Sequence, residues 1–273
     1  MKKKNIYTCF PCGKHKVLTM SYDDGQIHDR RLIEIFNKYG IKGTFHLNSA
    51  LMPSKNTMND ERRVSIEEIP ELYKGHEVSC HTAYHPTIAR CPITQVVQQV
   101  IEDRIVLEEA CGYPVRGMSY PNGSYNREIV DALPACGIEY SRVVGNTDDF
   151  GMPDNYLTWK STCHHSHKLM ENAERFAALN KRQYLYMMYV WGHSYEFDRD
   201  NSWELIEGFC KYIGGRDDIW YATNIEIVDY MNAAHALKFS AAGDIVYNPN
   251  AIPVWIAVDN VMHKLEPGTT VRI

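Results

Sequence analysis

KVLTMSYDDG, residues 16–25, joins a short apolar run to a pair of adjacent carboxylates. The run from Val17 to Met20 is typical of a buried strand, and Gly25 permits a sharp turn directly after Asp23 and Asp24. Two carboxylates this close ionise together only at a cost, unless a cation or a proton lies between them. The pair is therefore either an ordinary acidic Asp-Gly turn or part of a functional site, and the other strand ends must distinguish the two.

Strand and helix patterns alternate from this stretch to about residue 236. Roughly seven such units predict a parallel sheet covered by helices, and their combined length favours closure into an irregular (β/α)7-type barrel. An open doubly wound sheet is the alternative, but no G-x-G-x-x-G follows the first strand. Further strands are predicted at 42–48, 76–80, 115–119, 139–144, 184–191 and 218–222, and helices at 29–39, 65–73, 94–110, 126–136, 166–179, 203–213 and 225–236.

The remaining segments differ in character. Residues 49–64 are expected to form a polar loop, and residues 145–165 an irregular segment. The tail contains short strand-like runs separated by Gly, Pro and Asn. We therefore expect a barrel over residues 1–236, and over residues 237–273 a small C-terminal β appendage that packs on the barrel and is too short to fold alone.

Composition restricts the class of protein. The chain of 273 residues has 44% hydrophobic and 23% charged residues and a net charge of −5, so nothing in it favours nucleic acid or an anionic membrane as a partner. No apolar stretch is long enough to span a bilayer, and the basic N-terminus lacks the apolar run of a signal peptide. Eight scattered cysteines suit reduced thiols, and the single C-x-x-C at Cys9 and Cys12 has no second pair to complete a zinc site. These features predict a cytoplasmic protein.

Polar side chains gather at the predicted carboxyl ends of the strands, where α/β barrels carry their functional groups. A carboxylate with two neutral imidazoles is a suitable ligand set for zinc or a similar divalent metal, and it leaves positions open for water. An H-x-x-x-H pair alone is weak evidence, but here it coincides with the paired carboxylates. The strand-end residues are Asp23, Asp24, His81, His85, Ser119, Arg142, His193 and Asn224.

These motifs resemble those of the polysaccharide deacetylases with the NodB homology domain, also called carbohydrate esterase family 4. SYDDG at 21–25 is similar to the family's T-F-D-D-G, and HTAYH at 81–85 to its H-[ST]-x-x-H. SYPNG at 119–123 and the strand ending in WGH at 191–193 resemble the third and fifth motifs more loosely. The likeness runs in order from about Val17 to Tyr230.

The resemblance implies a role for each matching residue. Asp24, His81 and His85 would hold one divalent metal ion, with zinc the expected species. Asp23 would be the general base for the attacking water, and His193 the general acid for the leaving group. The backbone N–H of Asn122 would help to stabilise the oxyanion. Each role agrees with the chemistry, because an amine leaves poorly unless it is protonated and backbone donors can meet developing negative charge.

The sequence also departs from the family. The Arg of the third motif, which tunes the base, aligns with Ser119, so we expect Arg142 to replace it beside Asp23, with Arg116 as the alternative. The fourth motif has no clean match. Its candidates are Asp148, Asp149 and Trp159.

Further residues are candidates for contact with the substrate. Tyr120 replaces a proline of the third motif, and His164 and His165 lie in the irregular segment; a capping or solvent-facing role for the histidines is the alternative. Trp191 and Trp159 could stack on a sugar ring or belong to the core. Glu196 and Asp198 follow His193 and are either its partners or part of a solvated loop.

Together these observations predict a metal-dependent hydrolase that removes an acetyl group from an acetylated saccharide or another small acylated substrate. Two alternatives stay open: a catalytically silent carbohydrate-binding protein on the same fold, and an amidohydrolase acting on a small cyclic amide or imide. The sequence does not define the substrate, the physiological metal or the oligomeric state.

Overall fold

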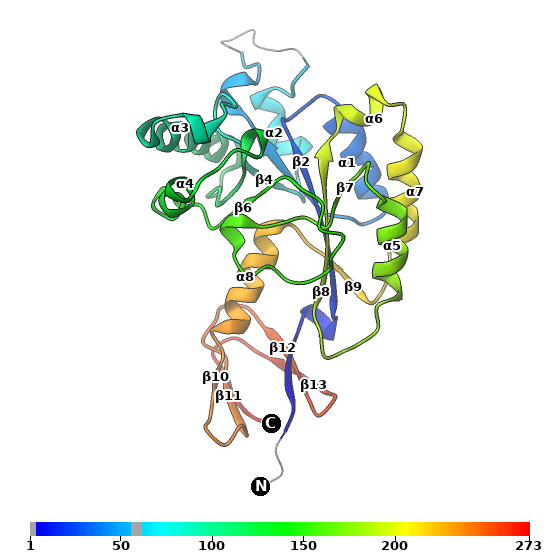
Figure 1. The fold of residues 1–273 in the computed structure, drawn as a ribbon. Coiled ribbons are helices and arrows are strands. Elements are labelled where there is room, and N and C mark those ends of the chain that lie inside the picture. The colour runs from blue at the N-terminus through cyan, green and yellow to red at the C-terminus, as the bar shows by residue number, and fades with distance from the viewer. Residues whose placement is uncertain (1–3, 56–61) are drawn as a thin grey trace.

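A computed structural model describes residues 4–55 and 62–273, so part of the predicted loop at 49–64 lies outside the described residues. The predicted barrel is confirmed, since parallel strands form a curled sheet in the order β6-β5-β4-β3-β2-β8-β7, with β9 paired to β2 (Figure 1). The barrel strands are β2 (Lys16–Asp23), β3 (Gly43–Leu47), β4 (Glu77–Cys80), β5 (Gly117–Ser119), β6 (Tyr140–Arg142), β7 (Cys163–His164), β8 (Tyr186–His193) and β9 (Ile219–Tyr221).

The barrel closes through the segment that sequence patterns mark as irregular. Trp159 forms a parallel bridge with Arg142 at the end of β6, and a few residues later β7 pairs with β8. The prediction of an irregular segment at 145–165 is therefore incomplete. The two residues of β7 are too few to show any periodicity, and they are held by neighbours on β8.

Helices cover the outer surface of the sheet (Figure 1). Gly112 ends α3 in a left-handed conformation at φ 76°, as is common at helix C-termini. Thr223 and Glu226 form a capping box that starts α8. The helices are α1 (Asp29–Lys38), α2 (Ile69–Leu72), α3 (Ile93–Cys111), α4 (Arg127–Ala132), α5 (Leu169–Ala178), α6 (Tyr195–Arg199), α7 (Trp203–Ile213) and α8 (Asn224–His235). The short α6 directly after β8 is absent from the sequence-based prediction.

The appendage below the barrel is made of two small antiparallel sheets, β1-β12-β13 and β10-β11-β14. Its apolar core is continuous with α8 and with side chains from the lower part of the barrel, including Val17 and Met187. Its strands are β1 (Ile6–Cys9), β10 (Lys238–Phe239), β11 (Ile245–Tyr247), β12 (Val254–Val258), β13 (Val261–Leu265) and β14 (Thr270–Arg272).

The N-terminal strand β1 belongs to this appendage and not to the barrel sheet, because Ile6 to Cys9 pair with Trp255 to Val258 of β12. Strand β1 and the C-terminal end of the chain therefore lie at the same end of the molecule (Figure 1). The division of the chain after residue 236 stays a prediction, but the C-terminal strands are completed by the N-terminal one.

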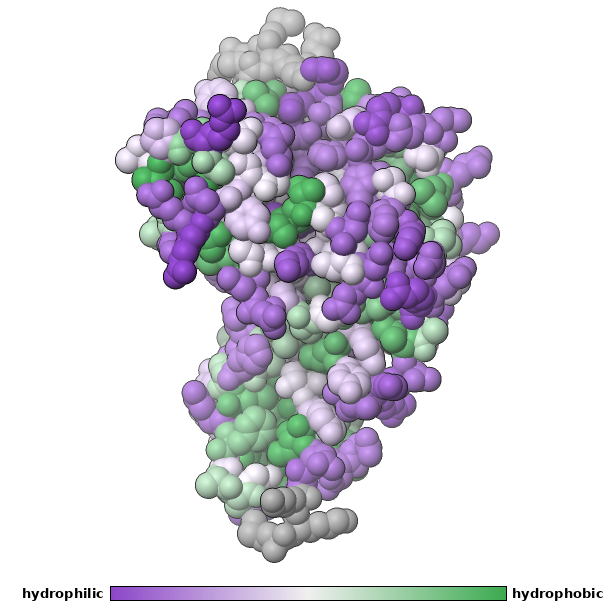
Figure 2. Space-filling view, in the orientation of Figure 1, coloured by the Kyte–Doolittle hydropathy of each residue, from purple (hydrophilic) through white to green (hydrophobic). Residues whose placement is uncertain are grey.

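Hydrophobic residues cover much of the appendage on the face seen in Figure 2, whereas the barrel part of this face is mostly polar. Exposed apolar side chains of the appendage include Phe239, Val261 and Met262. Among the described residues, no helix has the length and apolar character needed to cross a bilayer.

Candidate metal and catalytic site

Strand register brings the predicted functional residues to one level at the carboxyl end of the barrel. Asp23 on β2 pairs with His46 on β3 and with His193 on β8, and Ser119 on β5 pairs with Arg142 on β6. Since each of these residues is at or near the end of its strand, their side chains meet at one edge of the sheet.

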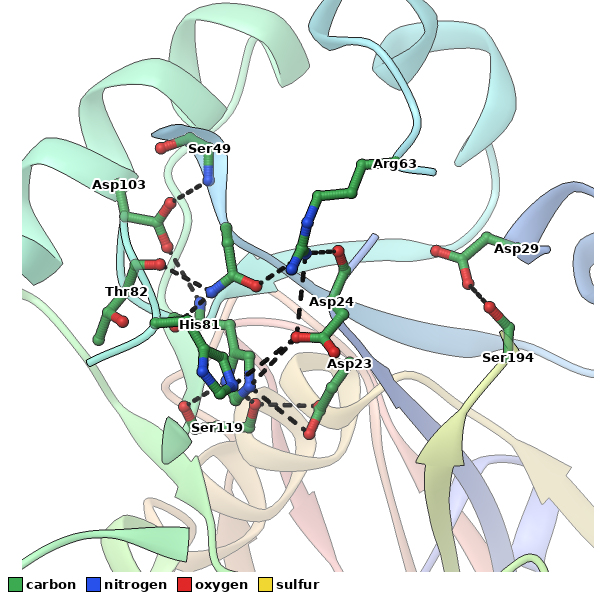
Figure 3. Close-up of polar contacts among 12 residues, drawn as sticks. Asp23, Asp24, Asp29, Ser49, Arg63, His81, Thr82, Asp103, Ser119 and Ser194 are labelled. Carbon is green, nitrogen blue, oxygen red and sulfur yellow. Dashed lines mark hydrogen bonds and ion pairs between the residues drawn. The ribbon is translucent and has the colours of Figure 1, made fainter. Parts of the chain in front are cut away.

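Asp24, His81 and His85 converge on a single point beside this edge. Figure 3 shows Asp24 and His81 facing each other there. Asp24 Oδ1 lies 3.9 Å from His81 Nε2 and 3.7 Å from His85 Nε2. Two atoms that share a zinc ion at about 2.0–2.2 Å can be at most about 4.4 Å apart, so these separations suit a shared cation. Asp24 Oδ1 is also buried without a hydrogen-bond partner among the described residues. The donor set therefore fits a divalent metal, although binding itself stays a prediction.

The proton on His81 is directed away from this point. His81 Nδ1 donates to the backbone oxygen of Ser119 at 2.9 Å and lies 2.6 Å from its hydroxyl. With the proton held on Nδ1, the lone pair of Nε2 faces Asp24, as a metal ligand requires. Burial lowers the pKa of His81 to about 4, so the ring is neutral near pH 7 without a metal.

The backbone that carries the ligands is held in unusual conformations. Asp24, Thr82 and His85 have φ of 81°, 63° and 56°, in the left-handed region that residues other than glycine rarely adopt. The side-chain amide of Asn48 donates to the carbonyls of His81 and Thr82 at 2.7 and 2.8 Å. Asp103 on α3 accepts from the His81 amide at 3.0 Å. These contacts hold the backbone of His81 and Thr82 in place and so fix the start of the ligand turn.

Asp23 forms a buried ion pair with Arg142. Arg142 Nη2 donates to Asp23 Oδ2, and Ser119 Oγ donates to Asp23 Oδ1 at 3.0 Å. Burial is the largest single influence and opposes ionisation of Asp23, but Arg142 together with nearby histidines outweighs it and holds the pKa of this carboxyl well below its usual range. Arg142 is fully buried and stacks on Trp191 at 4.5 Å. The expected position of Arg142 beside Asp23 is therefore observed.

Arg116, the alternative partner, lies elsewhere. It binds Asp229 at 2.6 Å and Glu139 at 3.0 Å at the surface. Ser119, which aligns with the missing arginine, has a structural role of its own in the site. Its carbonyl and hydroxyl connect the His81 ring with the Asp23 carboxylate.

His193 ends β8 and contacts Glu196, one turn further along the chain. The His193 amide donates to Glu196 Oε2 at 3.1 Å, and His193 Nδ1 lies 3.4 Å from the same oxygen. Burial alone would lower the pKa of His193, but Glu196, Asp23 and Asp24 together raise it above its ordinary value. Ser194 donates to the buried Asp29 at 2.5 Å, which ties the turn after His193 to α1 (Figure 3).

Two of the predicted substrate-contacting residues lie in the core, which argues against that prediction. Tyr120 is 1% exposed, and its hydroxyl donates to the Leu157 carbonyl at 2.7 Å. His165 is 2% exposed and stacks between Tyr22 and Phe197. The sequence alone does not show whether an aromatic residue after a strand faces the core of the barrel or the open site.

The other predicted contacts remain near the site. Trp191 is mostly buried and donates through Nε1 to Gly145 at 3.1 Å, so its ring mainly supports Arg142. His164 is half-buried and lies 2.9 Å from Glu196 through Nε2. Asn122 is in an exposed turn with φ 55°; its proposed oxyanion contact stays a prediction.

The fourth-motif candidates do not assemble beside His193. Asp148 binds His167 at 3.1 Å and Asn172 at 3.0 Å, and Trp159 is fully buried between Tyr140 and Tyr189. Glu196 takes the position beside the imidazole instead, whereas Asp198 is exposed.

His46, Asn48 and Asp103 are absent from the sequence-based site. His46 and Asn48 could have been found from their position at the end of KGTFHLN, the second predicted strand. Asp103 lies in the middle of a helix and gives no comparable signal.

Comparison with known proteins bears on the family and the fold. The family model described as polysaccharide deacetylase matches residues 11–141. A structure described as a putative polysaccharide deacetylase from Mycobacterium smegmatis has a TM-score of 0.61 at 15% identity, covering 84% of this chain and 94% of that one.

Two further structures share the fold at a TM-score of 0.51. A family 4 acetyl xylan esterase from Clostridium thermocellum, solved with a cobalt ion, is 14% identical over 78% of this chain and 90% of that one. A family 4 pseudoenzyme from Bacillus anthracis is 18% identical over 82% of this chain and 68% of that one. At these identities the likeness shows the fold alone. The family model and the shared fold agree with the resemblance seen in the motifs: residues 11–141 of this chain match the polysaccharide deacetylase family, and most of the chain has the fold of these structures.

Proposed function

We propose that this protein is a metal-dependent hydrolase that removes an acetyl group from an acetylated saccharide. One observation carries the proposal: an ionised buried carboxylate, Asp23, lies beside a convergent set of metal donors, Asp24, His81 and His85. A structural Asp-Gly turn needs neither the buried Arg142 nor the imidazoles. The family match and the cobalt-containing neighbour support the same reading.

A divalent cation held by these three residues would supply Lewis acidity, polarising the acyl carbonyl and making a water molecule more acidic. The chain supplies the rest. Asp23 remains ionised at neutral pH because Arg142 and Ser119 stabilise its charge, so it can accept the proton of the attacking water.

His193 supplies the proton for the leaving group. Burial opposes its protonation, but the surrounding carboxylates, chiefly Glu196, raise its pKa above the ordinary value and so favour the imidazolium. Because an amine is expelled far more easily when it is protonated, this acid favours amide substrates. The backbone N–H of Asn122 would stabilise the oxyanion of the tetrahedral intermediate.

The surroundings of the ligand turn suit a sugar. Tyr84, between the two histidine ligands, is 59% exposed and borders a hollow of about 320 Å³ that Ile105 and Val106 also line. Amphipathic rings at an open surface are suited to stacking against a saccharide. We place the acyl-bearing sugar across this surface. The proposal of a cytoplasmic site of action rests on composition alone.

The fold by itself does not establish catalysis, since one neighbour is a pseudoenzyme. Asp23→Asn separates the possibilities. It removes the base and keeps all three metal donors, so acetate release should fall by roughly 10²–10⁴-fold with the metal retained. The assay is acetate release by metal-loaded protein from acetylated saccharides and from a chromogenic acetyl ester.

Equal rates above background for wild type and Asp23→Asn would exclude this mechanism. Saccharide binding by wild type without any acetate release would favour the silent carbohydrate-binding protein. Turnover of small cyclic amides or imides in place of the acetylated substrates would favour the amidohydrolase.

A further inference from the structure

A second group of potential metal ligands lies next to the general acid. His164 from β7, His193 from β8 and Glu196 from α6 each direct one donor atom to a common point, with all three atoms within 4.8 Å of one another. Glu196 Oε2 is 2.9 Å from His164 Nε2 and 3.4 Å from His193 Nδ1. Because these residues come from three elements, their convergence is a property of the fold and not of one helical turn.

The distance between His164 Nε2 and Glu196 Oε2 is that of a hydrogen bond, whereas the distance between His193 Nδ1 and the same oxygen suits a shared metal ion better. His193 Nδ1 is buried and has no hydrogen-bond partner in the described part of the chain, and 3.4 Å exceeds the usual N–H···O length of about 2.7–3.2 Å. Two donors of a tetrahedral zinc ion at about 2.1 Å are separated by roughly 3.4 Å. All three side chains are half-buried, with 12–22% of their surface exposed, so an ion can reach them.

The neighbours of the cluster permit the required change of proton position. In the absence of a cation, the Ser166 amide donates to His164 Nδ1 at 3.2 Å, which leaves the proton on Nε2 facing Glu196. The Ser166 hydroxyl lies 2.7 Å from the same Nδ1 and can accept a proton placed there. His164 can therefore present its Nε2 lone pair to a cation while its other nitrogen remains hydrogen-bonded, as metal-bound histidines usually are.

Two further groups face Glu196, the charged Arg199 and His165, whose pKa is lowered to about 3 by burial. His165 Nε2 is 3.4 Å from Oε2, and Arg199 Nη2 is 3.7 Å from the other oxygen, Oε1. The Arg199 side chain is 56% exposed and also binds Asp200 at 2.7 Å. Its charge opposes a cation only from the outer side of the carboxylate, and the donor oxygen Oε2 faces away from it.

We propose that His164, His193 and Glu196 form a second, weaker zinc site that inhibits the enzyme when it is filled. When a zinc ion binds there, the proton on His164 Nε2 is replaced by one on Nδ1, beside the Ser166 hydroxyl, so His164 releases no net proton. The His193 imidazolium loses its Nδ1 proton to solvent. His193 is then a fixed ligand and no longer the imidazolium that the leaving group needs. This inhibition rests on the proposed acid role of His193, whereas the binding of a second ion does not.

Zinc stoichiometry tests the site without any reference to activity. Metal-free wild-type protein titrated with zinc in a calorimeter should bind two equivalents, the second more weakly than the first. His164→Asn removes a donor and should weaken the second site by at least about tenfold. His167→Asn is the matched control, because this nearby histidine pairs with Asp148 outside the cluster and should retain both equivalents. His81→Ala should lose the first site and keep the second.

Activity then tests the consequence. Acetate release by wild type and His167→Asn should rise with the first equivalent of zinc and fall with excess, whereas His164→Asn should lose the inhibition relative to its own rate at one equivalent. Glu196→Gln provides a second variant if His164→Asn fails to fold, as judged by its circular dichroism. A single equivalent bound by wild type, or two equivalents of unchanged affinity in His164→Asn, would overturn the site. Binding of two equivalents without acetate release at any zinc level would support the second site but exclude the proposed function.

Discussion

Replacement of Arg142 by methionine isolates the buried charge that keeps Asp23 ionised. The guanidinium is fully buried, donates to Asp23 and stacks on Trp191. Methionine is of similar length and is apolar, so the stacking surface is largely preserved while the charge is lost. Asp23 then keeps only the hydrogen bond from Ser119.

The expected loss of stability follows from removing one partner of a buried ion pair while the other stays buried. Such a change costs about 3–5 kcal/mol of unfolding free energy when the remaining charge stays uncompensated. In wild type the folded-state pKa of Asp23 is depressed, so its contribution to stability is present above the unfolded-state pKa of about 3.9 and is lost as pH falls through the folded-state value.

In Arg142→Met the strongest influence that opposes burial is lost, and the pKa of Asp23 is expected to rise above that of the unfolded chain. The sign of the linkage reverses, and stability then decreases as pH rises from about 4 toward 7. Activity should follow the same group, because a protonated Asp23 cannot act as a base. The acidic limb of the pH profile should move to higher pH.

Urea unfolding of metal-free protein at pH 5 and pH 7, with pH profiles of acetate release by loaded protein, measures both effects. Arg116→Met is the control, since its ion pairs with Glu139 and Asp229 are at the surface and should contribute no more than about 1 kcal/mol. An unchanged acidic limb in Arg142→Met, or equal destabilisation by both variants, would refute the assigned role.

Three further changes probe the support around the site. Glu196→Gln removes the chief carboxylate partner of His193, so the pKa of His193 should fall and the basic limb of the pH profile should move to lower pH; an unmoved limb would exclude this partnership. Asn48→Ala removes the side-chain amide that donates to the carbonyls of His81 and Thr82 in the ligand turn. Zinc affinity, measured by competition with a chelator, should drop by roughly 10–100-fold, and an unchanged affinity would contradict this role. In Gly192→Ala the new Cβ would lie 2.0 Å from the His165 ring, and the overpacking should cost about 1–3 kcal/mol in urea unfolding, whereas Gly208→Ala, with open space at its Cβ, should not.

The barrel could be predicted from sequence because its strands and helices carry strong, repeated signals. Trp203–Ile213 is predicted with the bounds that the structure has, and Asp29–Tyr39 with an end one residue too late. Short elements that depend on their neighbours were not predicted from the sequence. β7 has two residues and is held by β8, and β1 is recruited by the distant β12. Neither has enough local pattern to indicate a strand.

The sequence likewise predicted some residues of the candidate site and not others. Ligand chemistry at strand ends indicated Asp24, His81 and His85, and the missing arginine of the third motif directed attention to Arg142. What the sequence could not show is which side of the wall a side chain faces, so Tyr120 and His165 were assigned to the substrate although both are buried. Contacts across the fold, such as Asp103 on the His81 amide, depend on tertiary packing and leave no motif.

The dependence of acetate release on zinc occupancy tests the central claim most directly. Metal-free protein is titrated with zinc while acetate release and bound zinc are measured together. The account predicts no turnover without metal, a rate that rises in proportion to occupancy up to one equivalent, and no response in His81→Ala. Full activity in the metal-free protein, or the same zinc response in His81→Ala, would contradict it.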